Sequence, residues 1–266
     1  MVRLYGNYDA HNEWSIWKPA HIPKKYEQYF EDGRGRTSME FDQTVQVGSE
    51  QRRVVVLSTI ADGGGFEGCH ACSVLLSALV FSDGSPTPQI RQDFLMGYGQ
   101  EGEAPDILLL RLGSARVGLE FTQDYCMGGD CEGSLFLFGE VDGELHQILA
   151  LRSDNDDSNL NICTHPSKED AADCKADPPY CFGKTDAADK DYRENCTSWT
   201  GSLAVVAPHQ ESGWSDLIFT QHVKAARPDT FTHRQYVTRF RFTGTMYKAY
   251  GPPSKGPSLD INYYSH

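Results

Sequence analysis

Short runs of hydrophobic residues alternate with glycine-bearing turns along most of the chain. Residues 235–243 show the pattern most clearly, because aromatic residues and threonine at even positions alternate with valine and arginine at odd positions. A period of two is typical of a strand with one buried face and one solvent-exposed face. Comparable signals predict strands at residues 53–60, 73–81, 106–112, 116–123, 134–141, 144–152, 201–207, 215–223 and 235–243.

This close spacing of strands predicts an all-β fold, mainly antiparallel, in the form of a sandwich, a barrel or a propeller-like stack. Val141-Asp-Gly-Glu144 indicates a hairpin, because Asp-Gly supplies the positive φ angles of a tight turn. Residues 1–45 form an aromatic N-terminal segment, in which a short helix is predicted over residues 23–32 because proline suits its first turn and glycine follows its end. We expect residues 1–266 to form a single β-rich domain.

The longest break in the strand pattern is at residues 153–199, which are rich in Asp, Asn, Lys and Pro and hold four of the eight cysteines. A stretch of this length without structure of its own needs disulfide bonds to order it. We therefore interpret residues 153–199 as a cysteine-rich loop, stapled by disulfides, within the β domain. The Gly- and Pro-rich tail beyond Tyr250 is expected to be loosely held.

The number and placement of the cysteines indicate an exported protein. Eight is an even number, and a reducing cytosol would leave such thiols free to oxidise, so the pattern favours a periplasmic or secreted location. Cys126 and Cys131 flank a Met-Gly-Gly-Asp loop and form the first predicted disulfide, since neighbours in sequence close short loops at small entropic cost. The other cysteines predicted to form disulfides are Cys163 with Cys174, Cys181 with Cys196, and Cys69 with Cys72 as a structural cystine or paired thiols.

Two sequence segments bear on export and on membranes. Residues 1–14 contain no apolar run of the signal-peptide type, so we expect Met1 to stand in place of an export signal. The longest apolar stretch, residues 73–81, is far too short to span a bilayer, and no membrane insertion is expected.

Gly68-Cys-His-Ala-Cys72 is the most distinctive local motif. A strand followed by Cys-x-x-Cys occurs in thioredoxin-like thiol–disulfide oxidoreductases, where the first thiolate is stabilised at a helix N-terminus. The following residues 73–81 suit a buried strand as well as a helix, and no βαβ pattern completes that fold. A zinc site that uses Cys69, Cys72, Cys163 and His165 is a further alternative, but a second Cys-x-x-Cys pair is missing.

The same motif carries a resemblance over about 30 residues, which also involves Val54–Thr59 and Leu79–Phe81. These residues resemble a group of uncharacterised bacterial exported proteins that carry a Cys-His-Ala-Cys element. The resemblance implies a periplasmic setting and no known active site. The chain departs from the group where Ser73 follows the second cysteine in place of proline.

The net charge of −13 excludes a typical nucleic-acid binder, which needs a basic surface to displace counterions, and opposes docking on anionic lipid. Such a charge keeps a protein soluble, and the alternative interpretation is steering toward a basic partner protein. The oxygen-rich residues 154–161 could also hold calcium, but the turn glycine and the closing glutamate of such a loop are missing, and no metal or cofactor is predicted. The predicted partner-binding residues are Asp154, Asp156, Asp157, Asp170 and Asp173.

Hydrolase signatures such as Gly-x-Ser-x-Gly and His-Glu-x-x-His do not occur in the sequence, and no catalytic residues are predicted. The leading hypothesis is a non-enzymatic exported binding protein, of the inhibitor or immunity type, that neutralises a secreted toxin or enzyme. One alternative is a thiol–disulfide oxidoreductase that uses Cys69 and Cys72. The other is a module that binds carbohydrate or the cell envelope through exposed tryptophans, with Trp14, Trp17, Trp199 and Trp214 as candidates.

Overall fold

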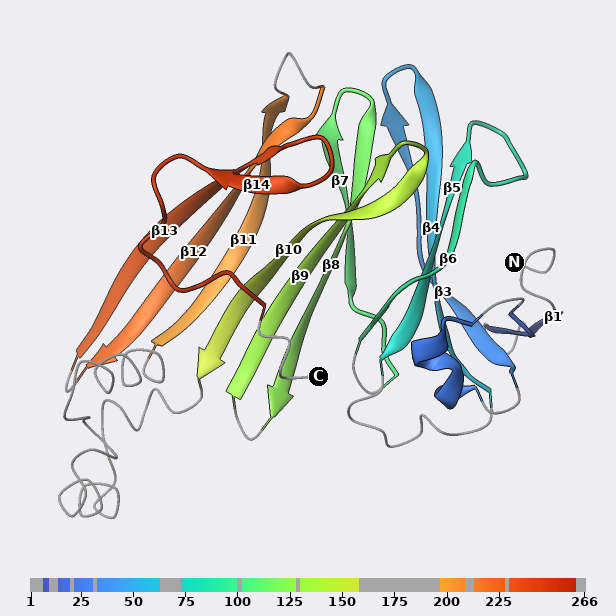
Figure 1. Ribbon diagram of the computed structural model, residues 1–266, viewed down its shortest axis with the longest axis horizontal. Coiled ribbons are helices and arrows are strands. Elements are labelled where there is room, and N and C mark those ends of the chain that lie inside the picture. The colour runs from blue at the N-terminus through green and yellow to red at the C-terminus, as the bar shows by residue number, and fades with distance from the viewer. Residues whose placement is uncertain are drawn as a thin grey trace, which may run out of the picture. The chain divides into compact units, whose positions relative to one another are not determined.

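The structure is almost entirely made of antiparallel β-strands (Figure 1), which confirms the predicted all-β class. A computed structural model describes residues 7–9, 14–19, 22–30, 33–62, 73–99, 102–127, 130–157, 197–208, 213–227 and 230–261. The described strands form one six-stranded and one eight-stranded sheet. In both sheets, strands that follow one another in sequence lie side by side, so both sheets are meanders.

The six-stranded sheet has the order β1-β2-β3-β4-β5-β6. Its strands are β1 (Asn7–Asp9), β2 (Trp14–Trp17), β3 (Gly35–Val47), β4 (Glu50–Ala61), β5 (Val74–Ser82) and β6 (Ile90–Tyr98). The eight-stranded sheet runs in the order β14 to β7. Its strands are β7 (Asp106–Gly113), β8 (Arg116–Met127), β9 (Asp130–Val141), β10 (Glu144–Asp157), β11 (Thr197–Pro208), β12 (Ser215–Arg227), β13 (Thr230–Phe242) and β14 (Tyr247–Tyr250).

Each predicted strand coincides with β4, β5 or one of the strands from β7 to β13. The short N-terminal helix predicted over residues 23–32 is wrong, because a single 3-10 helix, η1 (Lys24–Tyr29), takes its place. Tertiary packing accounts for the difference. Phe30 is only 5% exposed, and the Tyr26 ring lies so close to Gly97 that a Cβ there would be 2.5 Å from the tyrosine hydroxyl oxygen. A helix this short is too weak by itself to resist such contacts.

Clustering of contacts divides the chain into two compact units. One comprises Met1–Phe121, Leu137–Gln147 and Tyr263–His266, and the other comprises Thr122–Phe136 and Ile148–Asn262. Strands β8, β9 and β10 contribute residues to both units. The expectation of one domain therefore stays a prediction.

In the first unit, the central strands β4 and β5 are buried on both faces, as their continuous hydrophobic runs require. One face packs on the N-terminal segment, where Phe30 and Trp17 contact Phe94. The Trp17 Nε1–H donates to Thr37 Oγ1 over 2.7 Å, which satisfies the donor of the half-buried indole. Strand β4 also reaches β9 through an ion pair between Arg52 and Glu140, whose Nη1 and Oε2 atoms lie 2.6 Å apart.

In the second unit, the odd-numbered side chains of residues 215–223 in β12 are buried, and Leu217 and Phe219 have no exposed surface. Residues 251–261, which the sequence analysis expected to be loose, lie over this side of the sheet (Figure 1). The Arg152 N–H donates to the Leu259 carbonyl over 2.9 Å, and the Gln221 side-chain amide donates to the Pro257 carbonyl over 3.2 Å. The C-terminal segment therefore covers one face of strands β10 to β12.

The predicted loop at 153–199 begins later than expected. Strand β10 continues to Asp157, and β11 begins at Thr197. Asp154 pairs in register with Thr200, so the first acidic residues of the predicted loop are part of the sheet. Residues 158–196, with most of the predicted stapled loop, lie outside the described residues.

Candidate functional site

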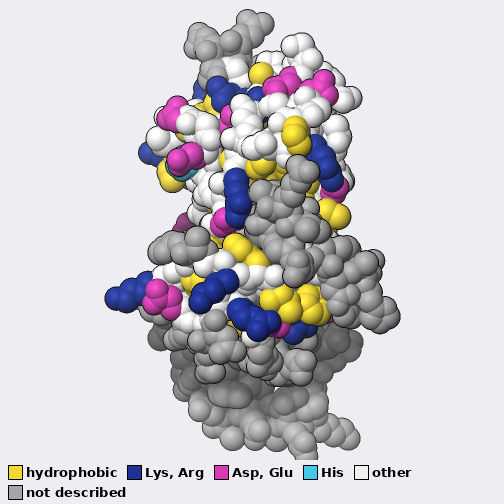
Figure 2. Space-filling view, turned by 90° about the vertical axis from the view of Figure 1, so that its right-hand side faces the viewer, with side chains coloured by type: hydrophobic (Ala, Val, Ile, Leu, Met, Phe, Trp, Pro, Cys, Tyr) yellow, Lys and Arg dark blue, Asp and Glu magenta, His cyan; other side chains and the backbone are white. Residues whose placement is uncertain are grey.

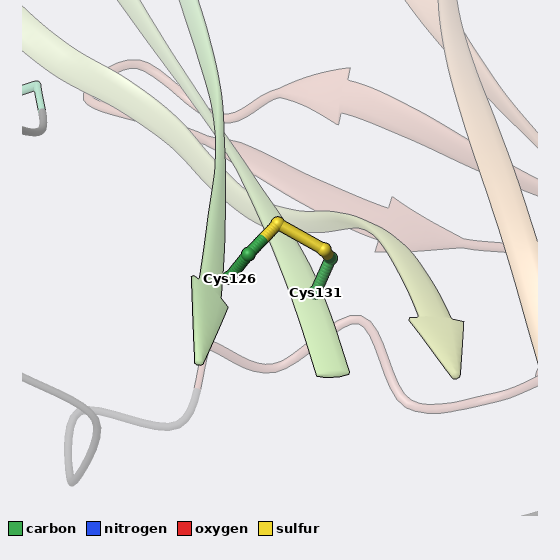
Figure 3. Close-up of a disulfide and its surroundings, with 2 residues drawn as sticks. All are labelled: Cys126 and Cys131. Atoms are coloured by element: carbon green, nitrogen blue, oxygen red, sulfur yellow. A yellow bond between two sulfur atoms is a disulfide. The ribbon is translucent and has the colours of Figure 1, made fainter. Parts of the chain in front are cut away.

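Cys126 at the end of β8 and Cys131 at the start of β9 form a disulfide, as the sequence predicted (Figure 3). Their Cα atoms lie 4.0 Å apart, and the two residues are separated by 5 positions in sequence. The bond ties two adjacent strands of the eight-stranded sheet together at one end. A cross-link of this kind fits an oxidising compartment.

Removal of this disulfide, by the double substitution Cys126→Ser and Cys131→Ser, is expected to lower the free energy of unfolding by about 2 kcal/mol, since the loss of loop-closure constraint is modest for a short loop. Urea denaturation followed by circular dichroism measures the change. The double variant Cys126→Ala, Cys131→Ala is the control for the polarity of serine, and it should lose the same amount of unfolding free energy as the serine double variant. An unchanged midpoint in both double variants would show that the bond contributes nothing to stability.

Two carboxyl groups lie together near the disulfide. Asp154 on β10 is half-buried, whereas Asp124 on β8 is exposed. Burial, and next the negative charge of Asp124, raise the pKa of Asp154 to about 6, although hydrogen bonds from Ser153 and from the Gly133 backbone act in the opposite direction. The lack of a side chain at Gly133 makes room for this carboxyl group, because a Cβ there would lie 1.8 Å from Asp154 Oδ2.

This pair does not by itself form a metal site. In the ranges that the structure describes, no group of three or more His, Cys, Asp or Glu side chains could hold a metal ion. The calcium alternative at residues 154–161 is only partly covered, because residues 154–157 are in β10 and the remainder falls outside the described residues. The part of Asp154 in partner binding stays a prediction.

Most other predicted site residues cannot be placed. Asp156 and Asp157 have a described backbone in β10, but their side chains are outside the description. The rest lie entirely outside the described residues, and their pairing, redox or binding roles stay predictions: Cys69, Cys72, Cys163, Cys174, Cys181, Cys196, Asp170 and Asp173.

Glu120 is a buried acid that sequence reasoning did not single out. It lies on β8 between Leu119 and Phe121 and is 7% exposed. Its Oε2 atom has no hydrogen-bond partner among the described residues, and burial raises the pKa of its carboxyl group to about 7. An acid with such a pKa can hold or release a proton near neutral pH, as catalytic acids do, but buried structural residues show the same behaviour. In the sequence, the feature that could have identified Glu120 as a buried acid is its position within a predicted strand, between two hydrophobic residues.

Three of the candidate tryptophans, Trp17, Trp199 and Trp214, pack against other side chains. Trp199 is 2% exposed and lies beneath the Arg152 guanidinium, and Trp214 is 5% exposed and stacks on Phe242 with ring centroids 3.8 Å apart. Trp17 is part of the core described above. A carbohydrate-binding platform needs exposed rings, so Trp199 and Trp214 do not provide one.

The second unit instead exposes a broad sheet face, which we call the β11–β14 face. It comprises the even-numbered residues 200–204 of β11 and 216–224 of β12, the odd-numbered residues 233–241 of β13, and Lys248 and Tyr250 of β14. Register pairing places these side chains on one side, opposite the buried Leu217 and Phe219. Val237 at its centre is 45% exposed. The predicted exposed side of residues 235–243 is therefore confirmed. The extension of this side over four strands depends on how β11 to β14 pair with one another, which the sequence alone does not reveal.

Positive charge dominates the β11–β14 face. Arg239, Arg241 and Lys248 are all exposed. Arg241 forms two hydrogen bonds with Asp216, of 3.1 Å from Nε and 3.0 Å from Nη2, and its guanidinium lies 4.4 Å from the centre of the Tyr250 ring. The Tyr250 hydroxyl donates to the same aspartate over 2.7 Å. These contacts hold a cation in a fixed position on an otherwise open surface.

The side of the molecule that lies at the right of Figure 1 carries a different distribution of charge. Figure 2 shows Lys and Arg side chains there beside Asp and Glu side chains, with hydrophobic side chains in separate small groups. The visible charges of this side are mixed in sign. The β11–β14 face is therefore the better candidate for selective recognition of a charged partner.

Comparison with protein-family models finds no match, and searches of curated proteins and of solved structures find none either. The resemblance carried by Gly68–Cys72 stays a prediction, and these residues are not among those described. Within the described ranges, no helix has the length and apolar character needed to cross a membrane. The functional argument therefore depends on the surfaces of this chain alone.

Proposed function

We propose that the protein is an exported, non-enzymatic binding protein of the inhibitor or immunity type, which neutralises a secreted toxin or enzyme by covering part of its surface. The observation that carries the proposal is the β11–β14 face. Residues 256–259 lie against the buried side of this sheet at Arg152, Gln221 and Tyr236, and the opposite side carries exposed or partly exposed side chains on four strands. Small-molecule sites are mostly concave, whereas a sheet face with exposed side chains on several strands suits contact with another protein.

Two further features support the proposal. The Cys126–Cys131 disulfide fits a periplasmic or secreted location. Residues 197–205 of β11 pair with β12 without a shift in register, and β12 pairs with β13 without a shift as well, so little conformational order has to be gained on binding.

Affinity capture from the exported fraction of the producing organism tests the proposal. The immobilised folded protein should retain an exported protein that forms a stable complex on size-exclusion chromatography. Where the captured protein is an enzyme or toxin, its activity should fall to zero as the binding protein is added in stoichiometric amount. Chemically unfolded protein on the same support is the control. Equal retention by both supports, or capture without loss of the partner's activity, contradicts this function.

A further inference from the structure

The charge of strands β12 to β14 is opposite to that of the whole chain. Residues 215–250 contain six Lys and Arg residues against two Asp residues, a net charge of +4, although the chain as a whole has a net charge of −13. Arg239, Arg241 and Lys248 project from the same side of the sheet. A local reversal of sign attracts an oppositely charged group at short range, because the field of more distant charges is screened beyond about 8–10 Å.

We propose that the β11–β14 face binds an acidic segment of a partner protein, and that Arg239, Arg241 and Lys248 pair with its carboxylates. This inference rests on the proposed function and specifies the chemistry of the contact. It departs from the basic partner that the net charge suggests, because the sign of the contact surface, and not of the whole chain, decides which groups pair.

The spacing of the cations suits an extended chain. Arg239 and Arg241 are two positions apart on β13, and Lys248 pairs in register with Arg241. Residues at alternate positions of a strand lie roughly 7 Å apart, which is also the repeat of alternate side chains in an extended peptide. Carboxylates at every second position of the partner can therefore meet Arg239 and Arg241 together.

Arg241 is fixed before the partner arrives. Asp216 engages its Nε and Nη2 atoms, and the Tyr250 ring lies beneath it. A guanidinium has five N–H donors, so donors remain for a second carboxylate, and the Arg241 side chain is 46% exposed. A preorganised cation binds with less loss of side-chain entropy than a mobile one.

Apolar side chains lie beside these charges. Val237 is 45% exposed, and Ile218 pairs in register with Arg239 at the centre of the face. Protein interfaces combine an apolar centre with a polar rim. Val237, Arg239 and Arg241 follow one another at alternate positions of β13, so a partner segment with one apolar and two acidic residues at alternate positions matches this arrangement. The apolar side chains of Val237 and Ile218 beside the cations suit the aliphatic side chains of a protein segment better than the sugar-phosphate backbone of a nucleic acid.

A titration with a defined peptide tests the inference. The probe is a labelled Ser-Glu-Ser-Glu-Ser-Val-Ser peptide, whose two Glu side chains and one Val side chain lie on one side when the peptide is extended. Its binding is followed by two-dimensional NMR of the 15N-labelled protein. We expect the shifts to concentrate on β12, β13 and β14, and the affinity to fall at least tenfold in the double variant Arg239→Glu, Lys248→Glu. Arg241 is left intact because it also contacts Asp216 and Tyr250.

The matched control is Arg234→Glu, which makes the same change of charge on the same strand. Arg234 is exposed but pairs in register with Val223, on the opposite side of the sheet. This variant should bind the peptide within twofold of the unchanged protein. The same peptide with Gln in place of both Glu residues should bind at least tenfold more weakly.

Three outcomes overturn the inference. The first is equal affinity for the peptide in the double variant and in Arg234→Glu. The second is a set of NMR shifts confined to strands other than β12, β13 and β14. The third is binding of a single-stranded DNA oligonucleotide of eight nucleotides as tightly as the peptide. The same variants in the capture experiment separate the two proposals. A partner retained equally by the unchanged protein and by the double variant leaves the binding function standing and removes this face from it.

Discussion

Replacement of Gly201 with alanine is expected to lower the free energy of unfolding by about 3 kcal/mol, because it forces an extra methyl group into a filled core. A Cβ at this position would lie 2.1 Å from Phe219 Cζ and 2.6 Å from the Ser153 carbonyl oxygen. Phe219 has no exposed surface, so its ring cannot move away without displacing its neighbours. Urea denaturation of the purified variant measures the loss.

The control for Gly201→Ala is Ser202→Ala on the exposed side of the same strand, which should change the free energy of unfolding by less than about 0.5 kcal/mol. Combining Gly201→Ala with Phe219→Leu should restore part of the lost stability, since the two sites are in direct contact. If Gly201→Ala unfolds at the same urea concentration as the unchanged protein, the close packing of β11 against Phe219 is incorrect.

Glu120→Gln is expected to make the protein more stable at pH 8 and to leave it nearly unchanged at pH 4. Burial raises the pKa of Glu120 from 4.5 to about 7, so between these values the folded protein keeps a proton that the unfolded chain releases. The stability of the unchanged protein therefore falls as the pH rises through this range. The full difference corresponds to roughly 3 kcal/mol above pH 7.

The measurement is the difference in unfolding free energy between Glu120→Gln and the unchanged protein from pH 4 to pH 8. Taking the difference removes the contribution of Asp154, whose raised pKa acts in the same direction. Ser202→Ala is the control, because it changes no ionisable group and Ser202 is exposed, and it should give a flat difference curve. A flat curve for Glu120→Gln as well would mean that Glu120 is not buried as an unpaired acid.

The sequence predicted the local features of the fold better than its long-range ones. The alternation along residues 235–243 predicted the two faces of β13, because a period of two is a property of the strand itself. Strand β3 escaped notice because most of its side chains are polar and at least partly exposed. The predicted helix at 23–32 failed because Tyr26 and Phe30 contact residues of β6, which are distant in sequence.

The candidate site was predictable only in part. Cys126 and Cys131 could be paired because a short loop brings them together whatever the rest of the chain does. The burial of Glu120 depends on what covers β8, which no local pattern reveals. The β11–β14 face requires the register of four strands, although the excess of Lys and Arg in residues 215–250 was a visible signal of its charge.

The meander order of the strands has a consequence for folding kinetics. Hairpins of neighbouring strands need only short loops to close. Strands β1 to β6 of one sheet, and strands β7 to β10 and β11 to β14 of the other, can therefore each form through local contacts. The pairing of β10 with β11 is different, since it joins Asp154 to Thr200 across a long stretch of chain. Closure entropy rises only with the logarithm of loop length, so this step delays folding more than it weakens the folded state. The strands that carry the β11–β14 face are thus suited to form as one cooperative group and to join the remainder of the sheet late.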